Sequence, residues 1–165
     1  MAEIDPRRIT FNGPLETGLR AVALLGAAYP RSYDLQRLVG VDYLLVHTGD
    51  VGGPASLHPP APMQSAELLV RRALIERALL LMMTRELVDR EIGPDGIRYV
   101  AGENAGSFLS SLESDYIKDL KVRAVWLIEA FGSTDELDFR SLMRKLFENW
   151  VEEFQTGDSS WGTEL

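Results

Sequence analysis

Both histidines of this chain, His47 and His58, fall in one short stretch rich in glycine and proline, and Asp50 lies between them. Two imidazoles and a carboxylate are a ligand set that can bind zinc or iron and leave positions open for water or substrate. These three residues are therefore weak metal candidates. Their spacing matches no zinc signature, so we predict a tight loop whose histidines bond to the backbone, with no metal or other cofactor. A small metalloenzyme using this loop remains an alternative.

No other segment has the sequence pattern of an active site. Ser56 lies close to His58, but it is not in a Gly-x-Ser-x-Gly elbow. Neither the phosphate-binding loop of ATPases nor the dinucleotide fingerprint is present. The chain also has no cysteine, which excludes thiolate metal sites and disulfides. We therefore predict no catalytic residue and no enzyme activity.

The charge balance argues against a DNA-binding module that works alone. The net charge is −8, and the chain up to Phe147 has 17 basic and 20 acidic residues, a balance of −3. Binding to nucleic acid depends on basic side chains that neutralise phosphates. The arginine candidates for contact with DNA or a partner are Arg71, Arg72 and Arg77 on a predicted helix, with Arg90 and Arg98 on the hairpin that follows. Glu76 and Glu86 interleave with them at salt-bridge spacing, which favours a solvated face or a partner contact.

Length and composition indicate one globular domain. A chain of 165 residues, 45% of them hydrophobic, can bury a conventional core. We predict a single domain over 11–155, a flexible N-terminus over 1–10 and a flexible acidic tail over 156–165. Trp161 in that tail is a candidate anchor for a partner's pocket. The chain lacks both the secretory apolar core and the ~20-residue run of a membrane span, so we expect a cytoplasmic protein without membrane contact.

Helical periodicity predicts three helices before a hairpin. The first begins at Pro14 and ends before Pro30, because proline suits a first helical turn and cannot continue a helix. The second opens near Ser32 or Asp34 and continues to about Leu45, and a long loop over 48–63 follows. The third begins at Gln64 or Ser65 and ends near Leu87. Its run Leu79–Met83 is apolar all round, which predicts cover on every side, as a core axis or an oligomer contact.

A hairpin and more helices are predicted after the third helix. The segments 88–92 and 97–101 flank Gly93-Pro94-Asp95-Gly96, which matches a type I turn. This order of elements is that of a winged helix-turn-helix. Two additional C-terminal helices follow: an apolar row from Phe108 to Phe131, which either continues or restarts, and a last helix opening at Ser133 to Asp135. The last helix is expected to bury Phe139, Leu142, Leu146, Trp150 and Phe154. The predicted fold class is mainly α, with a winged-helix-like core.

Several segments, in order, resemble the small middle component of bacterial ABC-three-component systems. The resemblance covers roughly Phe11 to Phe154. The segments that carry it are Phe11 to Arg20, Asp42 to Asp50, Ser56 to Pro59, Glu67 to Arg72, Gly96 to Tyr99, and Tyr116 with Trp126. The His47-Thr48-Gly49-Asp50 loop, taken with the order of the segments, makes the combination specific.

The resemblance implies a non-enzymatic adaptor encoded with an SMC-like or Rad50-like ABC ATPase and an effector subunit. Such systems are linked to defence against phage or plasmid DNA. No catalytic residue carries over, and the matching residues are implied to determine fold and interfaces: Asn12, Glu16, Arg20, Asp42, His47, Asp50 and His58. DNA within the assembled complex and a homo-oligomer stay open. A winged-helix transcriptional regulator, which would bind a specific duplex by itself, is the other alternative.

Overall fold

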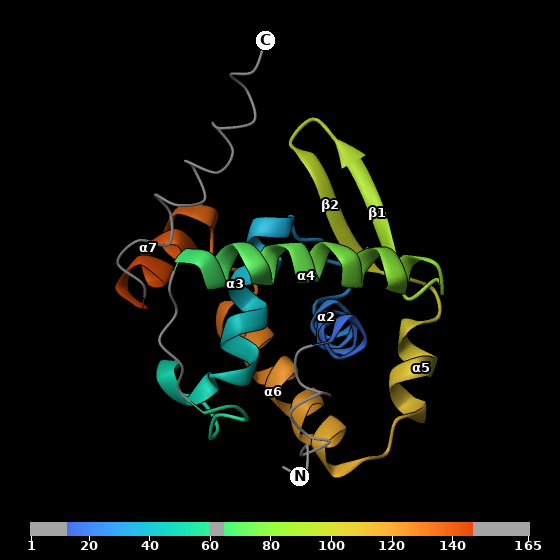
Figure 1. Cartoon of the computed structure of the whole chain (residues 1–165), viewed down its shortest axis with the longest axis horizontal. Helices are drawn as coiled ribbons and strands as arrows, with labels where there is room; N and C mark the ends of the chain where they lie inside the picture. The colour runs from blue at the N-terminus through green and yellow to red at the C-terminus, as the bar shows by residue number, and fades with distance from the viewer. Residues whose placement is uncertain (1–12, 60–64, 147–165) are drawn as a thin grey trace, which may run out of the picture.

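The described part of the chain, residues 13–59 and 65–146 of a computed structural model, is mainly helical (Figure 1). Its elements are α2 (Pro14–Ala28), α3 (Leu35–Val46), the 3-10 turn η1 (Thr48–Val51), α4 (Ser65–Met83), β1 (Val88–Gly93), β2 (Gly96–Ala101), α5 (Ala105–Ser111), α6 (Asp115–Phe131) and α7 (Glu136–Leu146). Three helices precede an antiparallel hairpin, and further helices follow it. This order confirms the predicted mainly α, winged-helix-like fold.

Local sequence signals set the ends of these helices. Pro14 occupies the first turn of α2, where its missing N–H costs no hydrogen bond. The Asp34 carboxylate caps α3 by accepting a hydrogen bond from the Arg37 backbone N–H at 2.7 Å. Ser114 caps α6 in the same way through the Ile117 N–H, at 3.3 Å. The starts of α2 and α3 could be predicted because their signals are contained within one turn, whereas the start of α6 at Ser114 was not predicted.

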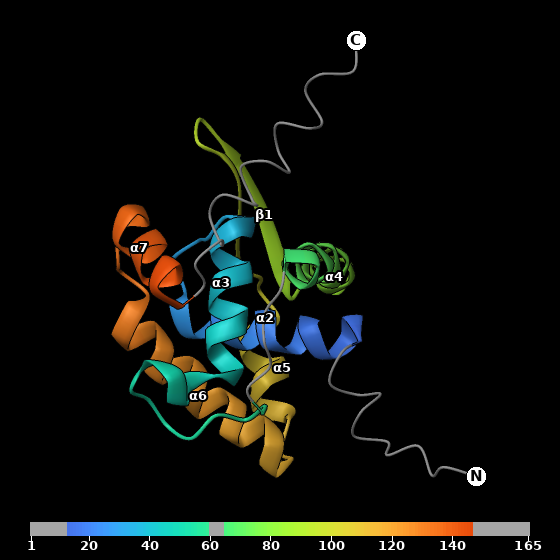
Figure 2. The ribbon, with the colours of Figure 1, turned by 60° about the vertical axis from the view of Figure 1, so that its left-hand side comes forward.

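Helix α2 runs through the middle of the fold, and α3, α4 and α6 pack around it (Figures 1 and 2). Residues 21–25 of α2 are each at most 4% exposed. A helix buried on all sides is the axis of a core. The run Leu79–Met83 of α4 is not the core axis of this chain, and the oligomer contact that the sequence also allows stays a prediction. Leu79 and Met82 are buried, but Leu80 is 56% exposed because α4 packs on α2 and α3 with one side only.

The hairpin forms a wing that projects past α4 (Figure 1). Strands β1 and β2 pair in antiparallel register, with Ile92 opposite Ile97. Gly96 closes the turn with a φ of +102°, in the left-handed region that favours glycine. Tyr33, between α2 and α3, exchanges two backbone hydrogen bonds with Tyr99, at 2.9 and 2.7 Å. This bridge ties the base of the wing to the start of α3.

Three helices, rather than the predicted two, follow the wing in the described chain. The apolar row that starts at Phe108 restarts after residues 112–114, so it forms the short α5 and then α6. On α7, Phe139 is buried, as expected, and Leu142 and Leu146 are half-buried. The expected burial of Trp150 and Phe154 lies outside the described residues. None of the described helices is long and apolar enough to cross a membrane.

Candidate functional site

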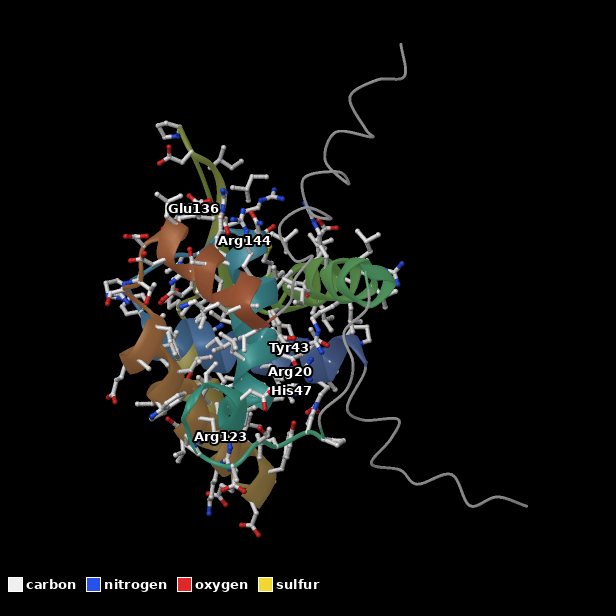
Figure 3. All side chains as sticks on the ribbon, turned by 90° about the vertical axis from the view of Figure 1, so that its left-hand side faces the viewer. Arg20, Tyr43, His47, Arg123, Glu136 and Arg144 are labelled. Carbon is white, nitrogen blue, oxygen red and sulfur yellow. The ribbon has the colours of Figure 1, made fainter. Side chains whose placement is uncertain are left out.

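Charged and polar side chains meet inside the molecule where α2, α3, α4 and α6 come together. We call this group the polar cluster. Its members are Glu16, Thr17 and Arg20 of α2, Asp42, Tyr43 and His47 at α3, His58 of the following loop, Arg71 of α4 and Tyr116 of α6. Figure 3 shows Arg20, Tyr43 and His47 lying together beside α3. Every helix of the winged-helix-like core therefore contributes to it.

Asp42 lies at the centre of the polar cluster between two arginines. The Arg20 Nε donates to Asp42 Oδ1 at 2.8 Å, and the Arg71 Nη1 donates to Asp42 Oδ2 at 2.5 Å. The side chains of Arg20 and Asp42 are each only 4% exposed. Burial by itself would raise the pKa of Asp42, but the charges of Arg20 and Arg71 outweigh it and lower that pKa. Asp42 is therefore a buried carboxylate satisfied by two guanidinium groups.

The geometry of α2 places the other acidic group of the cluster beside this pair. Glu16 and Arg20 are four residues apart, and so share one face of the helix. Thr17 lies on the same face and accepts a hydrogen bond from Arg20 Nη2 at 3.3 Å. All three side chains are buried, and no hydrogen bond to Glu16 Oε1 is present among the described residues. A polar face on this helix can be buried only because α3, α4 and α6 supply partners.

His58 and Tyr116 join the loop to α6. The His58 Nε2 lies 3.3 Å from the Tyr116 hydroxyl oxygen. Burial, followed by the positive charges of Arg20 and His47, lowers the pKa of His58 to about 4. Burial, followed by the charge and hydrogen bond of Glu16, raises the pKa of Tyr116. Both side chains are therefore neutral near pH 7, and they contact each other without a net charge.

His47 closes the end of α3 and packs against two rings. Its imidazole meets the Tyr43 ring edge-on at a centroid distance of 4.2 Å and the His58 ring at 6.3 Å. The side chain is 4% exposed, and burial lowers its pKa. Its Nδ1 has no hydrogen-bond partner within the described chain. His47 therefore packs mainly as an aromatic group rather than through the backbone bond that we predicted.

The loop between α3 and α4 is folded upon itself as far as Pro59. The Thr48 hydroxyl donates to the Pro54 carbonyl at 2.7 Å, and the Ser56 hydroxyl accepts from the Gly49 N–H at 3.0 Å. Arg123 of α6, labelled in Figure 3, donates twice to the Ala55 carbonyl, at 2.9 and 2.8 Å. The Ala55 carbonyl therefore anchors the loop to α6 through its two hydrogen bonds from Arg123.

The three weak metal candidates are only partly brought together. His47 and His58 are neighbours, whereas Asp50 is exposed on η1. Within 13–59 and 65–146, no group of three or more histidine, aspartate or glutamate residues is placed to hold a metal ion. His58 bonds the Val46 carbonyl through its backbone N–H, at 3.0 Å, rather than through its ring. The main polar site that sequence reasoning missed is therefore the Arg20–Asp42–Arg71 group, not the histidines.

The predicted contact arginines have different surroundings. Arg71 points inward to Asp42, and Arg98 donates from Nε and Nη2 to the Ser32 hydroxyl and carbonyl, at 3.0 and 2.8 Å. Arg72 is half-buried, while Arg77 and Arg90 are exposed. Arg71 is thus a member of the polar cluster rather than an open surface cation. Trp161, the other predicted contact, lies outside the described residues.

The fold and the polar cluster together define a winged-helix-like protein. We use the term family markers for the seven residues that the resemblance singled out: Asn12, Glu16, Arg20, Asp42, His47, Asp50 and His58. Five of the markers lie in the cluster: Glu16, Arg20, Asp42, His47 and His58. Asp50 lies outside it, and Asn12 is beyond the described part. The chain matches the family described as ABC-three component (ABC-3C) system Middle Component 2 over residues 10–153, and it belongs to this family. Searches of curated proteins and of solved structures gave no match.

Proposed function

We propose that this protein is a non-catalytic adaptor that joins the SMC-like or Rad50-like ABC ATPase of its three-component system to the effector subunit. The system would act in the cytoplasm against phage or plasmid DNA. Membership of the middle-component family supports a place in an assembly with other components. The observation that carries the adaptor role is an exposed apolar face on α4.

Two leucines define this α4 outer face. Leu69 and Leu80 are 53% and 56% exposed, and their separation of eleven positions is close to three helical turns, so they lie on one side of α4. Val70 is 67% exposed beside Leu69, and the exposed Ala73 lies one turn further along. The exposed Glu76 also lies on this side, between Leu69 and Leu80, so the face combines apolar side chains with one carboxylate. The opposite side of α4 packs on α2 and α3, so this face looks away from the molecule (Figures 2 and 3). An apolar face of this kind is typical of a surface that a protein partner covers.

The wing offers a second apolar surface. Ile92 and Ile97 oppose each other near the turn and are 77% and 45% exposed. They belong to the hairpin, whereas the α4 outer face belongs to a helix, so the two surfaces are carried by separate elements (Figure 1). Two surfaces suit a protein that holds two partners at once. We assign one component of the system to each.

The polar cluster supports a structural role for the family markers. Asp42 is neutralised by two arginines, and a histidine whose pKa is about 4 is a weak base near neutral pH. The cluster instead links α2, α3, α4 and α6 into one unit. Such a unit would hold α4 and the wing in a fixed relation. The proposal does not require DNA binding or a homo-oligomer.

Co-purification of the three components tests the adaptor role. The tagged wild-type chain should retain both the ATPase and the effector. Leu69→Asp with Leu80→Asp should lose one component, and Ile92→Asp with Ile97→Asp should lose the other. Leu137→Asp on α7 is the matched control, because Leu137 is 73% exposed but lies on neither surface. A wild-type chain that retains neither component would contradict the proposal, as would surface variants that retain both.

A further inference from the structure

A pocket of about 320 Å³ lies where the start of α3, the base of β2 and the segment joining α6 to α7 meet. Four arginines line it: Arg31, Arg37, Arg98 and Arg140. The acidic side chains in its wall are Asp34 and Glu136. This volume is at the lower end of the range of ligand-binding pockets, which suits one small group rather than a large cofactor.

Two of the four arginines are fixed in place by protein contacts. The Arg37 Nη2 donates to the carbonyls of Phe131 and Thr134, both at 2.9 Å, and its guanidinium carbon lies 3.9 Å from the centroid of the Phe139 ring. Arg98 is held by its two bonds to Ser32. The positive charge of the pocket is therefore organised before any ligand arrives, which reduces the ordering cost of binding.

Donors outnumber acceptors in this pocket. The Nε atoms of Arg37 and Arg140 are buried and have no hydrogen-bond partner among the described residues, and the Arg31 guanidinium makes no hydrogen bond to them either, although the Arg31 backbone N–H donates to the Ala28 carbonyl. Both acids are already engaged: Asp34 caps α3, and Glu136 accepts from Arg140 Nη2 at 2.5 Å. The positive end of the α3 dipole adds to this excess. A pocket lined by four guanidinium groups, whose two acids are already engaged, is matched by a ligand with a negatively charged acceptor group.

We propose that this pocket binds a carboxylate of an acidic segment in a protein partner. A carboxylate fits because the flat guanidinium group can bond both of its oxygens. Duplex DNA is the weaker choice, because its binding depends on many basic side chains spread along the phosphate backbone, whereas this pocket suits one small group and the net charge is −8. The chemistry of the ligand follows from the pocket, whereas its source, another component of the system, rests on the proposed adaptor role.

An NMR titration of the full-length chain tests the pocket. The probe is a blocked tetraglutamate peptide, followed through the backbone amides and the arginine Nε–H signals. The peptide should shift the signals of Arg31, Arg37 and Arg140. Arg31→Gln with Arg140→Gln should weaken binding at least about tenfold, because it removes charge-assisted hydrogen bonds. The control is Arg85→Gln with Arg144→Gln, which removes the same charge outside the pocket and should bind within about twofold of wild type. Arg144 lies on α7 with Glu136 (Figure 3), so the control also tests general effects on that helix.

Several results would overturn this inference. A blocked tetraglutamine peptide that binds as tightly as the tetraglutamate peptide would show that the pocket does not recognise negative charge. Equal binding by the pocket variant and its control would place the site elsewhere, and an absence of shifts with excess peptide would remove it. If a short DNA duplex shifted the same signals at a lower concentration, the ligand of the pocket would be a phosphate group rather than a carboxylate of a protein partner. Because the titration uses the chain alone, it can fail while the three components still co-purify, and it can succeed when they do not.

Discussion

The carboxylate of Asp42 and the guanidinium of Arg20, 22 positions apart in the chain, meet 2.8 Å apart in the interior. Arg71 approaches the same carboxylate from α4. A single acidic side chain of α3 thereby connects to two of the helices that pack on it, α2 and α4. We infer that this contact fixes how α4, with its exposed outer face, is seated on the core.

Asp42→Asn should destabilise the protein by about 3–5 kcal/mol, because it leaves the buried Arg20 without its counter-charge. Urea unfolding followed by circular dichroism measures this loss. Glu136→Gln is the comparison, since it breaks an exposed ion pair with Arg140 and should cost at most about 1 kcal/mol. Equal losses of unfolding free energy in the two variants would show that the buried Asp42 contact stabilises the protein no more than the exposed pair does.

Acid should destabilise the protein below about pH 6.5, partly through His58. Its folded-state pKa is about 4, whereas an unfolded histidine has a pKa of about 6.5. The unfolded chain therefore takes up a proton first, so stability that is present above pH 6.5 is lost as the pH falls toward 4. The slope from one such group is at most about 1.4 kcal/mol per pH unit. His47, whose pKa is also lowered by burial, acts in the same direction.

His58→Gln should flatten this pH dependence, because glutamine does not titrate. Unfolding free energies measured at several pH values between 4.5 and 7.5 give the comparison. Asp42 contributes little over this range, since its lowered pKa places most of its loss of stability below about pH 4. A variant whose stability falls with acid as steeply as that of the wild type would rule out His58 as a source of the effect.

Gly53→Ala should loosen the loop from α6. A Cβ at this position would lie 2.5 Å from the Trp126 ring. This contact is too close, so either the Trp126 side chain or the loop would have to move. Overpacking of this kind costs about 1–3 kcal/mol. Gly106→Ala on α5 is the matched control, because its added Cβ meets nothing within 4 Å. Thermal unfolding of both variants should separate them, and a Gly53→Ala protein as stable as the control would mean that the loop does not rest on Trp126.

Zinc binding separates the adaptor from the metalloenzyme alternative. We expect no stoichiometric zinc or iron after incubation with either metal, measured by elemental analysis of the desalted protein. His47→Ala should then change nothing in the metal content. One equivalent of metal in the wild type, lost in His47→Ala, would favour the metalloenzyme instead.

Local signals account for what the sequence predicted well. Pro14, Asp34 and Gly96 each act within one turn of chain, so the ends of α2 and α3 and the position of the hairpin could be predicted. The exposure of Leu80 could not, because an apolar run does not reveal on which side its neighbours lie. The sequence does not fix the break between α5 and α6 either, because one apolar row fits one helix or two.

Contacts between distant residues account for what was missed. Asp42 lies among mostly apolar residues in the second half of α3, and its partner Arg71 is 29 positions away, so nothing nearby in the sequence marks a buried ion pair. Arg71 looked like a surface cation for the same reason. The arginine pocket joins Arg37 to carbonyls more than 90 positions further along. Such a site depends on how helices pack, and only the fold reveals it.

The most direct test of the adaptor role is the mass of the reconstituted assembly, measured by light scattering during size-exclusion chromatography. The ATPase and effector mixed without this chain should elute separately, each with its own mass. Adding the chain should produce one species that contains all three components. An ATPase and effector that associate equally well without the chain, or that remain separate in its presence, would contradict the account.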